Sequence, residues 1–185
     1  MSLFLIPLVA LLAAIIVLYN RLVRSRNRVD TAWSDIDVQL QRRHDLIPNL
    51  VSAVDQYAGY ERATLKAVVA LRSEAARVTD VDALGKVEED LGYGMHRLIA
   101  LAENYPDLKA NENFLNLQKE LVEIEGSLQF ARRYYNGSVR DFNTMTETVP
   151  SNLVASVFKF GPRAFFQKSS DDVAVVPLVR LGSSE

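Results

Sequence analysis

The chain opens with an apolar run that contains no charged side chain. Residues Leu3–Tyr19 are interrupted only by Pro7, near the start of the run. As a helix, the first 19 residues would cover about 28 Å, close to the thickness of a hydrocarbon core. A cleaved signal peptide is the alternative, but no Lys or Arg precedes the run and no small-x-small cleavage site follows it. The pattern therefore predicts a retained transmembrane anchor at residues 1–20.

Positive charge follows this run, and no charged side chain precedes it. The positive-inside rule then predicts that the amino terminus lies outside and that the rest of the chain lies in the cytoplasm. An aromatic residue at the end of the run suits the membrane interface. The residues that carry this orientation are Tyr19, Arg21, Arg24, Arg26 and Arg28.

Beyond the anchor, apolar positions recur at steps of four and three, the period of an amphipathic helix. The first series continues to Tyr57, and only Arg43 breaks its apolar character. We expect this helix to continue from the anchor without a loop and to kink at Pro48, which removes one backbone hydrogen bond. The series is Val29, Trp33, Ile36, Leu40, Arg43, Ile47, Leu50, Val54 and Tyr57.

Three further helices are predicted. The second covers about residues 60–78, and the third follows a polar turn at 79–82 and ends near Asn104. The fourth begins at a cap supplied by Asn111 or Asn113 and ends before Pro150. Four amphipathic helices with short links predict an all-α, antiparallel, up-and-down four-helix bundle over residues 21–149.

Gly59 decides the number of helices in this prediction. As a break, it separates the first helix from the second. If the helix instead continues through Gly59, the bundle has three members, and the first helix needs a partner from a second copy of the chain.

The chain after residue 149 divides into two parts. Residues 150–168 are aromatic and basic and are assigned to the end of the bundle, whereas 169–185 are expected to form a flexible tail. Val173–Leu181 is rich in Val but contains Pro177, so it is tail or at most an edge strand. The aromatic side chains either cap the open end of the core, which we favour, or contact the membrane surface. The candidates for membrane contact are Phe158, Phe160, Arg163, Phe165 and Phe166.

Composition narrows the classes of function. The 185 residues include 21 Lys and Arg against 23 Asp and Glu, so the net charge of −2 gives no basis for nucleic-acid binding. The chain has no Cys, which excludes disulfides, thiolate nucleophiles and Cys-ligated metals. His44 and His96 lie on different predicted helices, and Gly92 and Gly94 are too sparse for a phosphate-binding loop. We therefore expect neither a catalytic site nor a cofactor.

Several polar residues stand out from the helical pattern. Arg43 occupies a core position, so it needs a buried partner, for which Glu125 and Glu120 are the candidates. A polar layer inside the bundle is predicted from four residues: Arg43, Arg132, Tyr135 and Asn136.

The segment around Pro48 has two interpretations. In the structural one, which we favour, the side chain of Asp45 or Asn49 satisfies the backbone groups that Pro48 frees. In the other, Asp45, Pro48 and Asn49 form a notch in which a protein partner docks.

Three blocks of sequence resemble a known family. The first is QRRHDLIPNLV at 41–51, and the second is YPDLKAN at 105–111. The third comprises Ala131-Arg132, Tyr135-Asn136 and Phe142-Asn143, and it ends with PSNLVA at 150–155. In this order, over roughly residues 21–166, the blocks resemble the LemA proteins of bacteria.

The resemblance implies an amino-terminal anchor and an antiparallel helical domain related to bromodomain-like four-helix bundles. It also implies a family whose molecular activity is poorly defined, one relative acting in magnetosome membrane formation. Relatives with a lipoprotein-type amino terminus carry Cys, which this chain lacks. We therefore expect an anchor of peptide rather than lipid.

Together these features predict a single-pass protein of the bacterial plasma membrane with a cytoplasmic, non-enzymatic scaffold or adaptor domain. Its expected partners are membrane lipid, through the first helix, and a protein that the sequence does not identify. Two alternatives stay open: a homo-oligomeric structural protein that organises or shapes the membrane, and an accessory subunit of a membrane protease or transporter.

Overall fold

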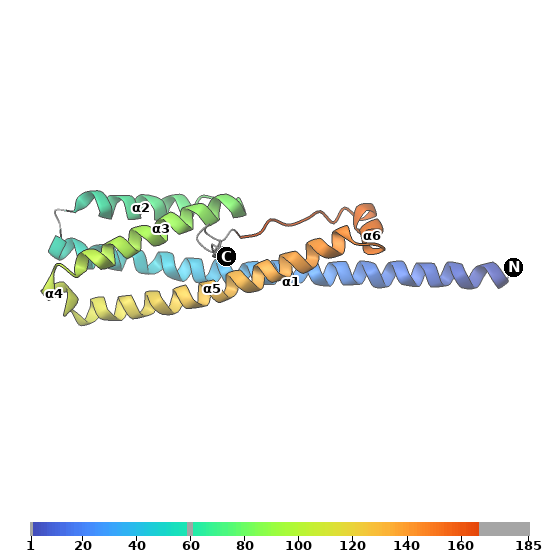
Figure 1. Cartoon of the computed structure of the whole chain (residues 1–185), viewed down its shortest axis with the longest axis horizontal. Helices are drawn as coiled ribbons and strands as arrows, with labels where there is room; N and C mark the ends of the chain where they lie inside the picture. Colours follow the sequence, from blue (N-terminus) through green and yellow to red (C-terminus); the bar gives the residue numbers. More distant parts are fainter. Residues whose placement is uncertain (1, 59–60, 167–185) are drawn as a thin grey trace, which may run out of the picture.

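The computed structural model describes residues 2–58 and 61–166, and all regular structure in these residues is helical (Figure 1). No strand occurs in them, so the predicted all-α class is confirmed. The elements are α1 (Ser2–Ala58), α2 (Arg62–Ala75), α3 (Val81–Ala102), α4 (Pro106–Lys109), α5 (Glu112–Glu147) and α6 (Ser151–Val157).

The predicted continuity of the anchor with the first helix is confirmed, because α1 is a single helix from Ser2 to Ala58. Gly59 lies outside the described residues, but α1 ends directly before it and α2 runs back in the opposite direction (Figure 1). Sequence reasoning missed α4, which begins with Pro106, a residue suited to the first helical position. Asn111, rather than Asn113, caps α5 by accepting the backbone N–H of Phe114 at 3.2 Å.

The long helix α1 organises the molecule, because it packs against each of the other five helices. Helix α5 lies antiparallel along it, and α2 and α3 pair with each other against its carboxyl-terminal half (Figure 1). The amino-terminal stretch of α1 extends beyond all of them. Only 6% of its most apolar 18-residue window is buried in the protein, and no other described helix is long and apolar enough to span a membrane.

The apolar core is divided into two clusters along the molecule. One contains Leu22 and Phe142, at the end nearer the apolar stretch, and the other contains Leu50 and Phe114, at the far end. The division arises because a charged residue occupies a core position on three helices. These charged residues lie between the two clusters.

The segment after α6 and its turn is an extended strap, residues 160–166, that runs back along the molecule (Figure 1). Two asparagines of α5 hold it. Asn143 accepts the N–H of Arg163 at 2.8 Å and donates to its carbonyl oxygen at 2.9 Å, and Asn136 makes the same pair of bonds with Phe166, both at 2.9 Å. The two side chains are seven positions apart, so they lie on one face of α5. They replace the backbone partners that an extended segment would find in a sheet.

The turn between α6 and the strap has the geometry of a Schellman cap. The N–H of Phe160 bonds the carbonyl oxygen of Ala155 at 2.9 Å, and the N–H of Lys159 bonds that of Ser156 at 3.3 Å. Lys159 adopts the left-handed conformation, with φ at 57°. This conformation strains a residue that has a Cβ, so the surrounding contacts must hold the turn in place.

We predict that Asn136→Leu releases the strap. The variant loses two hydrogen bonds, each contributing about 0.5–1.5 kcal/mol, so the free energy of unfolding should fall by about 1–3 kcal/mol. Trypsin should also cleave faster after Arg163, because that site leaves its ordered position. Asn116→Leu is the matched control, since Asn116 is an exposed asparagine on the same helix. Equal cleavage rates in the two variants would show that Asn136 does not hold the strap.

Candidate functional site

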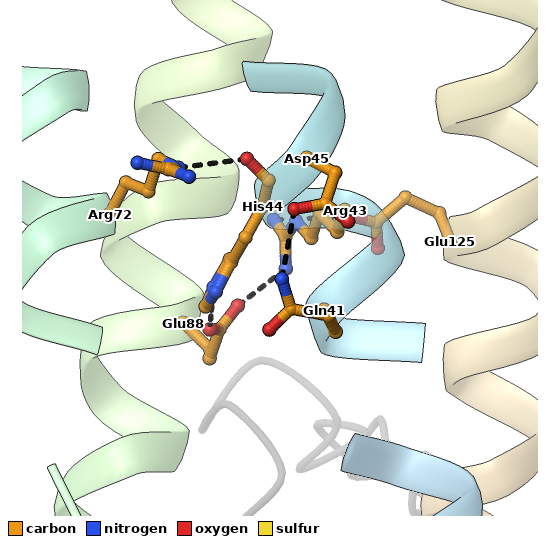
Figure 2. A network of polar contacts seen from close by, with 7 residues as sticks. All are labelled: Gln41, Arg43, His44, Asp45, Arg72, Glu88 and Glu125. Carbon is orange, nitrogen blue, oxygen red and sulfur yellow. Dashed lines mark hydrogen bonds and ion pairs between the residues drawn. The ribbon is translucent and has the colours of Figure 1, made fainter. Parts of the chain in front are cut away.

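A buried ion pair lies between the two core clusters. Arg43 of α1 is 2% exposed and Glu88 of α3 is fully buried, and Arg43 Nη1 donates to Glu88 Oε2 at 3.1 Å (Figure 2). The other terminal nitrogen, Arg43 Nη2, pairs with Glu125 Oε1 of α5, also at 3.1 Å. The expected pairing of Arg43 with Glu125 is thus present, and one guanidinium joins three helices.

His44 completes the coordination of the buried carboxylate. Its Nε2 lies 2.6 Å from Glu88 Oε1, so both oxygens of Glu88 have a partner (Figure 2). An unpaired buried carboxylate would be strongly destabilising, so the two adjacent residues Arg43 and His44 are both needed opposite it. We call Arg43, His44, Glu88 and Glu125 the ionic cluster.

Helix α2 contacts the ionic cluster through the backbone hydrogen bond that Pro48 removes from α1. Pro48 has no N–H, so the carbonyl oxygen of His44, four residues earlier, lacks its helical donor. Arg72 of α2 supplies one, with Nε donating to that oxygen at 2.8 Å (Figure 2). The expectation that Asp45 or Asn49 does so is wrong for this carbonyl: the Asp45 carboxylate instead accepts a hydrogen bond from Gln41 at 2.8 Å.

Helix α3 makes room for the guanidinium with a glycine. A Cβ at Gly92 would lie 2.8 Å from Arg43 Nη2, closer than side chains tolerate. Gly94 similarly faces Val68 of α2, where a Cβ would lie 2.9 Å from Cγ2. The two glycines lie within α3 and allow close packing.

The predicted polar layer separates into two groups. Arg43 belongs to the ionic cluster, whereas Tyr135 and Asn136 bind the strap, Tyr135 donating to the Ala164 carbonyl oxygen at 2.9 Å. Arg132 lies between the groups. Its guanidinium stacks on the Phe166 ring at 4.8 Å, and its Nε is buried with no hydrogen-bond partner among the described residues.

Burial is the main cause of the pKa shifts of Arg132 and Tyr135 on α5. It lowers the pKa of Arg132, and the nearby charge of Arg43 lowers that pKa further. Burial likewise raises the pKa of Tyr135, so its hydroxyl stays protonated and able to donate to the strap.

The candidate membrane-contact residues lie in different environments. Phe158 is exposed and its ring centroid lies 4.7 Å from that of Tyr19, at the end of the apolar stretch. Phe160 is partly buried against the core, and Phe166 is only 1% exposed. Arg163 pairs with Asp30 at 3.1 Å. Phe165 is exposed like Phe158, but it lies near the end of the strap that is remote from α6.

A groove follows the line between α1 and α5. It consists of adjoining hollows of about 750, 400 and 540 Å³, which share lining residues. The docking candidates Asp45 and Asn49 line two of the hollows, and Pro48 is exposed beside them. The groove is lined by one basic side chain, Arg42, and by four acidic ones: Asp35, Asp45, Glu120 and Glu123.

Sequence reasoning missed Glu88 as the partner of Arg43, although each is a charged residue at a position where the helical series of its own helix is otherwise apolar. Leu84, Leu91, Met95 and Leu98 follow steps of four and three along α3, and Glu88 occupies the position that this series leaves open. An acid in one apolar series and a base in another predict a buried pair. No group of three or more His, Cys, Asp or Glu side chains able to hold a metal occurs within 2–58 and 61–166.

Comparison with known proteins gives a consistent picture. The sequence profile described as "LemA family" matches residues 32–180, beyond the blocks that carry the resemblance. The chain is 30% identical to "Protein LemA" of Metamycoplasma hominis, over 81% of this chain and 69% of that protein. It is 23% identical to each of "Magnetosome protein MamQ 1" and "Magnetosome protein MamQ 2" of Paramagnetospirillum magneticum, over 92% of this chain and 73% of those proteins.

A double-mutant cycle tests the buried pair. Arg43→Met leaves the buried Glu88 carboxylate without its guanidinium partner and with His44 alone beside it among the described residues, and Glu88→Leu leaves Arg43 without its fully buried acid. Each single variant should lose about 3–5 kcal/mol of unfolding free energy, and the double variant should lose much less than the sum. Denaturant unfolding of the detergent-solubilised chain measures all three. Glu120→Gln, an exposed acid on α5, should change little; strictly additive losses would contradict the pairing.

Proposed function

Because the chain belongs to the LemA family, we propose that it is a single-pass protein of the bacterial plasma membrane with a cytoplasmic, non-enzymatic scaffold domain. The names of its relatives state no enzymatic activity. The proposed architecture is a transmembrane stretch of α1, followed by an up-and-down four-helix bundle built from the rest of α1 with α2, α3 and α5.

The observation that carries this proposal is the continuity of α1. A stretch that is apolar enough to span a membrane, and almost unburied in the protein, leads without a loop into the helix that every other helix contacts. An apolar face left in water would be strongly unfavourable, whereas a bilayer covers it. The arginines that follow Tyr19 favour the cytoplasmic side for the domain.

The groove between α1 and α5 is the docking surface of the proposed scaffold. Exposed apolar side chains, Val122, Phe130 and Tyr134, line it beside the acids. Its chemistry fits an amphipathic helix with a basic face, held by apolar anchors and a charged rim. The acids of the groove outnumber its one base, Arg42, by four to one. A second copy of the same groove would therefore mostly oppose acid to acid, which disfavours the homo-oligomer.

The accessory-subunit alternative is compatible with this surface. The partner helix would then belong to a membrane protease or transporter, and Asp45, Pro48 and Asn49 would contact it near the middle and far end of the groove.

We predict the membrane orientation as follows. The chain has no Cys, so single cysteines report position without background substitutions. A membrane-impermeant maleimide should label Ser2→Cys in intact cells and Glu103→Cys, on the exposed surface beyond α3, only after permeabilisation. The reverse pattern would place the domain outside and overturn the cytoplasmic scaffold.

We predict that the groove binds a basic amphipathic helix. The probe is a fluorescent 18-residue helix of Leu and Lys, and fluorescence anisotropy measures its affinity for the full chain in nanodiscs. Glu123→Lys should weaken binding by about two- to fivefold, as expected for one rim ion pair. Phe130→Ser should weaken it by about tenfold or more, as for an aromatic anchor. Glu103→Lys, the same charge change outside the groove, should leave affinity close to wild type. If all three variants behave alike, the groove is not the docking surface.

A further inference from the structure

Helix α6 carries an apolar face that nothing in the described residues covers. Val157 is 74% exposed and Leu153 is 65% exposed, and Val149 and Phe158 are also exposed. The opposite side, with Val154 and Ala155, is buried in the core. An exposed apolar face of this kind marks an interaction surface.

The position of α6 identifies what covers that face. Helix α6 contacts α1 at the base of the free amino-terminal stretch (Figure 1). Ile15 and Leu18, within the apolar stretch, pack against the same core cluster as Val154. The exposed face of α6 therefore lies at the level of the last turns of the proposed membrane span.

We propose that α6 and the residues that flank it form a membrane-interface segment, in which Leu153 and Val157 of the helix and the neighbouring Val149 and Phe158 enter the boundary between lipid headgroups and acyl chains. This inference rests on the proposed membrane anchor. Tyr19, whose ring contacts Phe158, lies where an interfacial aromatic is favoured. Ile15 precedes Tyr19 by four positions, about 6 Å along the helix, which agrees with the shallow burial of interfacial segments.

The charges nearby fit a lipid headgroup layer directly beyond this level. Arg21, Arg24 and Arg28 line a hollow of about 510 Å³ against the end of α5. Arg21 and Arg24 follow Tyr19 along α1 by about 3 and 8 Å, within the roughly 5–8 Å of one headgroup layer, and Arg28 lies about 14 Å beyond Tyr19, on the aqueous side of that layer. Lys159, exposed next to Phe158, adds a further cation. Along α1, apolar side chains precede Tyr19 and cations follow it. This order matches that of the acyl-chain layer and the anionic headgroup layer of a bilayer.

The strap, by contrast, lies away from the bilayer. Phe166 packs against Trp33, with ring centroids 5.8 Å apart. Trp33 follows Tyr19 by 14 positions, about 21 Å along α1, beyond the reach of the interface. The lipid contact is thus made by residues 149–158, and the later aromatic side chains belong to the core or to the strap.

The test uses single-cysteine variants of the full chain, each labelled with the environment-sensitive fluorophore NBD. The protein is reconstituted into phosphatidylcholine–phosphatidylglycerol vesicles with or without a lipid that carries a nitroxide on its acyl chain. Val157→Cys and Leu153→Cys report on α6. Val122→Cys is the matched control, because Val122 is a helical valine that is 71% exposed on α5. Val9→Cys reports on the anchor.

We expect labels at positions 157 and 153 to shift to shorter emission wavelength and to lose most of their fluorescence to the nitroxide lipid. The label at 122 should respond only to aqueous iodide. If position 9 is quenched by lipid while 157 and 153 behave like 122, the inference is wrong and the anchor stands. If 157 and 153 resist both quenchers, a protein covers α6, and the inference is again wrong. If position 9 is not quenched by lipid, the anchor itself fails, and the inference fails with it.

Discussion

The fold depends on one interaction, the salt bridge between Arg43 and Glu88 in the middle of the apolar core. On three helices the charged residue lies between the two core clusters: Arg43 between Leu40 and Ile47, Glu88 between Leu84 and Leu91, and Glu125 between Leu121 and Leu128. Leucine stripes tolerate sliding by one turn, about 5.4 Å, but a buried carboxylate does not. The ionic cluster therefore fixes the register of α1, α3 and α5.

Pro48 brings the remaining long helix into the same arrangement. By removing one donor from α1 it leaves the His44 carbonyl oxygen available, and Arg72 of α2 binds that oxygen. His44 thus uses its ring for Glu88 and its backbone carbonyl for Arg72, so two groups of one residue contact two other helices. The LemA-like block at 41–51 is accordingly explained by packing, and the proposed docking surface lies on the neighbouring exposed face.

The sequence predicted the helices well because their apolar residues recur with helical period over long stretches. It also identified Arg43 and the cap at Asn111. It did not predict which helix supplies each partner, because period alone does not say which faces meet: Tyr135 and Asn136 appeared equivalent to Arg43, yet they bind a strap whose extended path has no pattern of its own. The roles of Glu88 and Arg72 depend on contacts between residues 28 and 45 positions apart, which no local pattern reports.

If the apolar stretch spans a membrane as proposed, the unbroken course of α1 would hold the domain at a fixed distance from the bilayer. From Tyr19 to Ala58 the helix rises about 58 Å. In the proposed arrangement the groove would therefore begin, at Asp35, about 24 Å from the lipid and continue outward. A flexible linker would let the domain sample every height, whereas a continuous helix converts a 10° tilt of the span into a sideways displacement of about 10 Å at the far end. The proposed contact of α6 with lipid would add a second support beside the helix. The groove would then be accessible only to proteins that extend to that distance from the membrane.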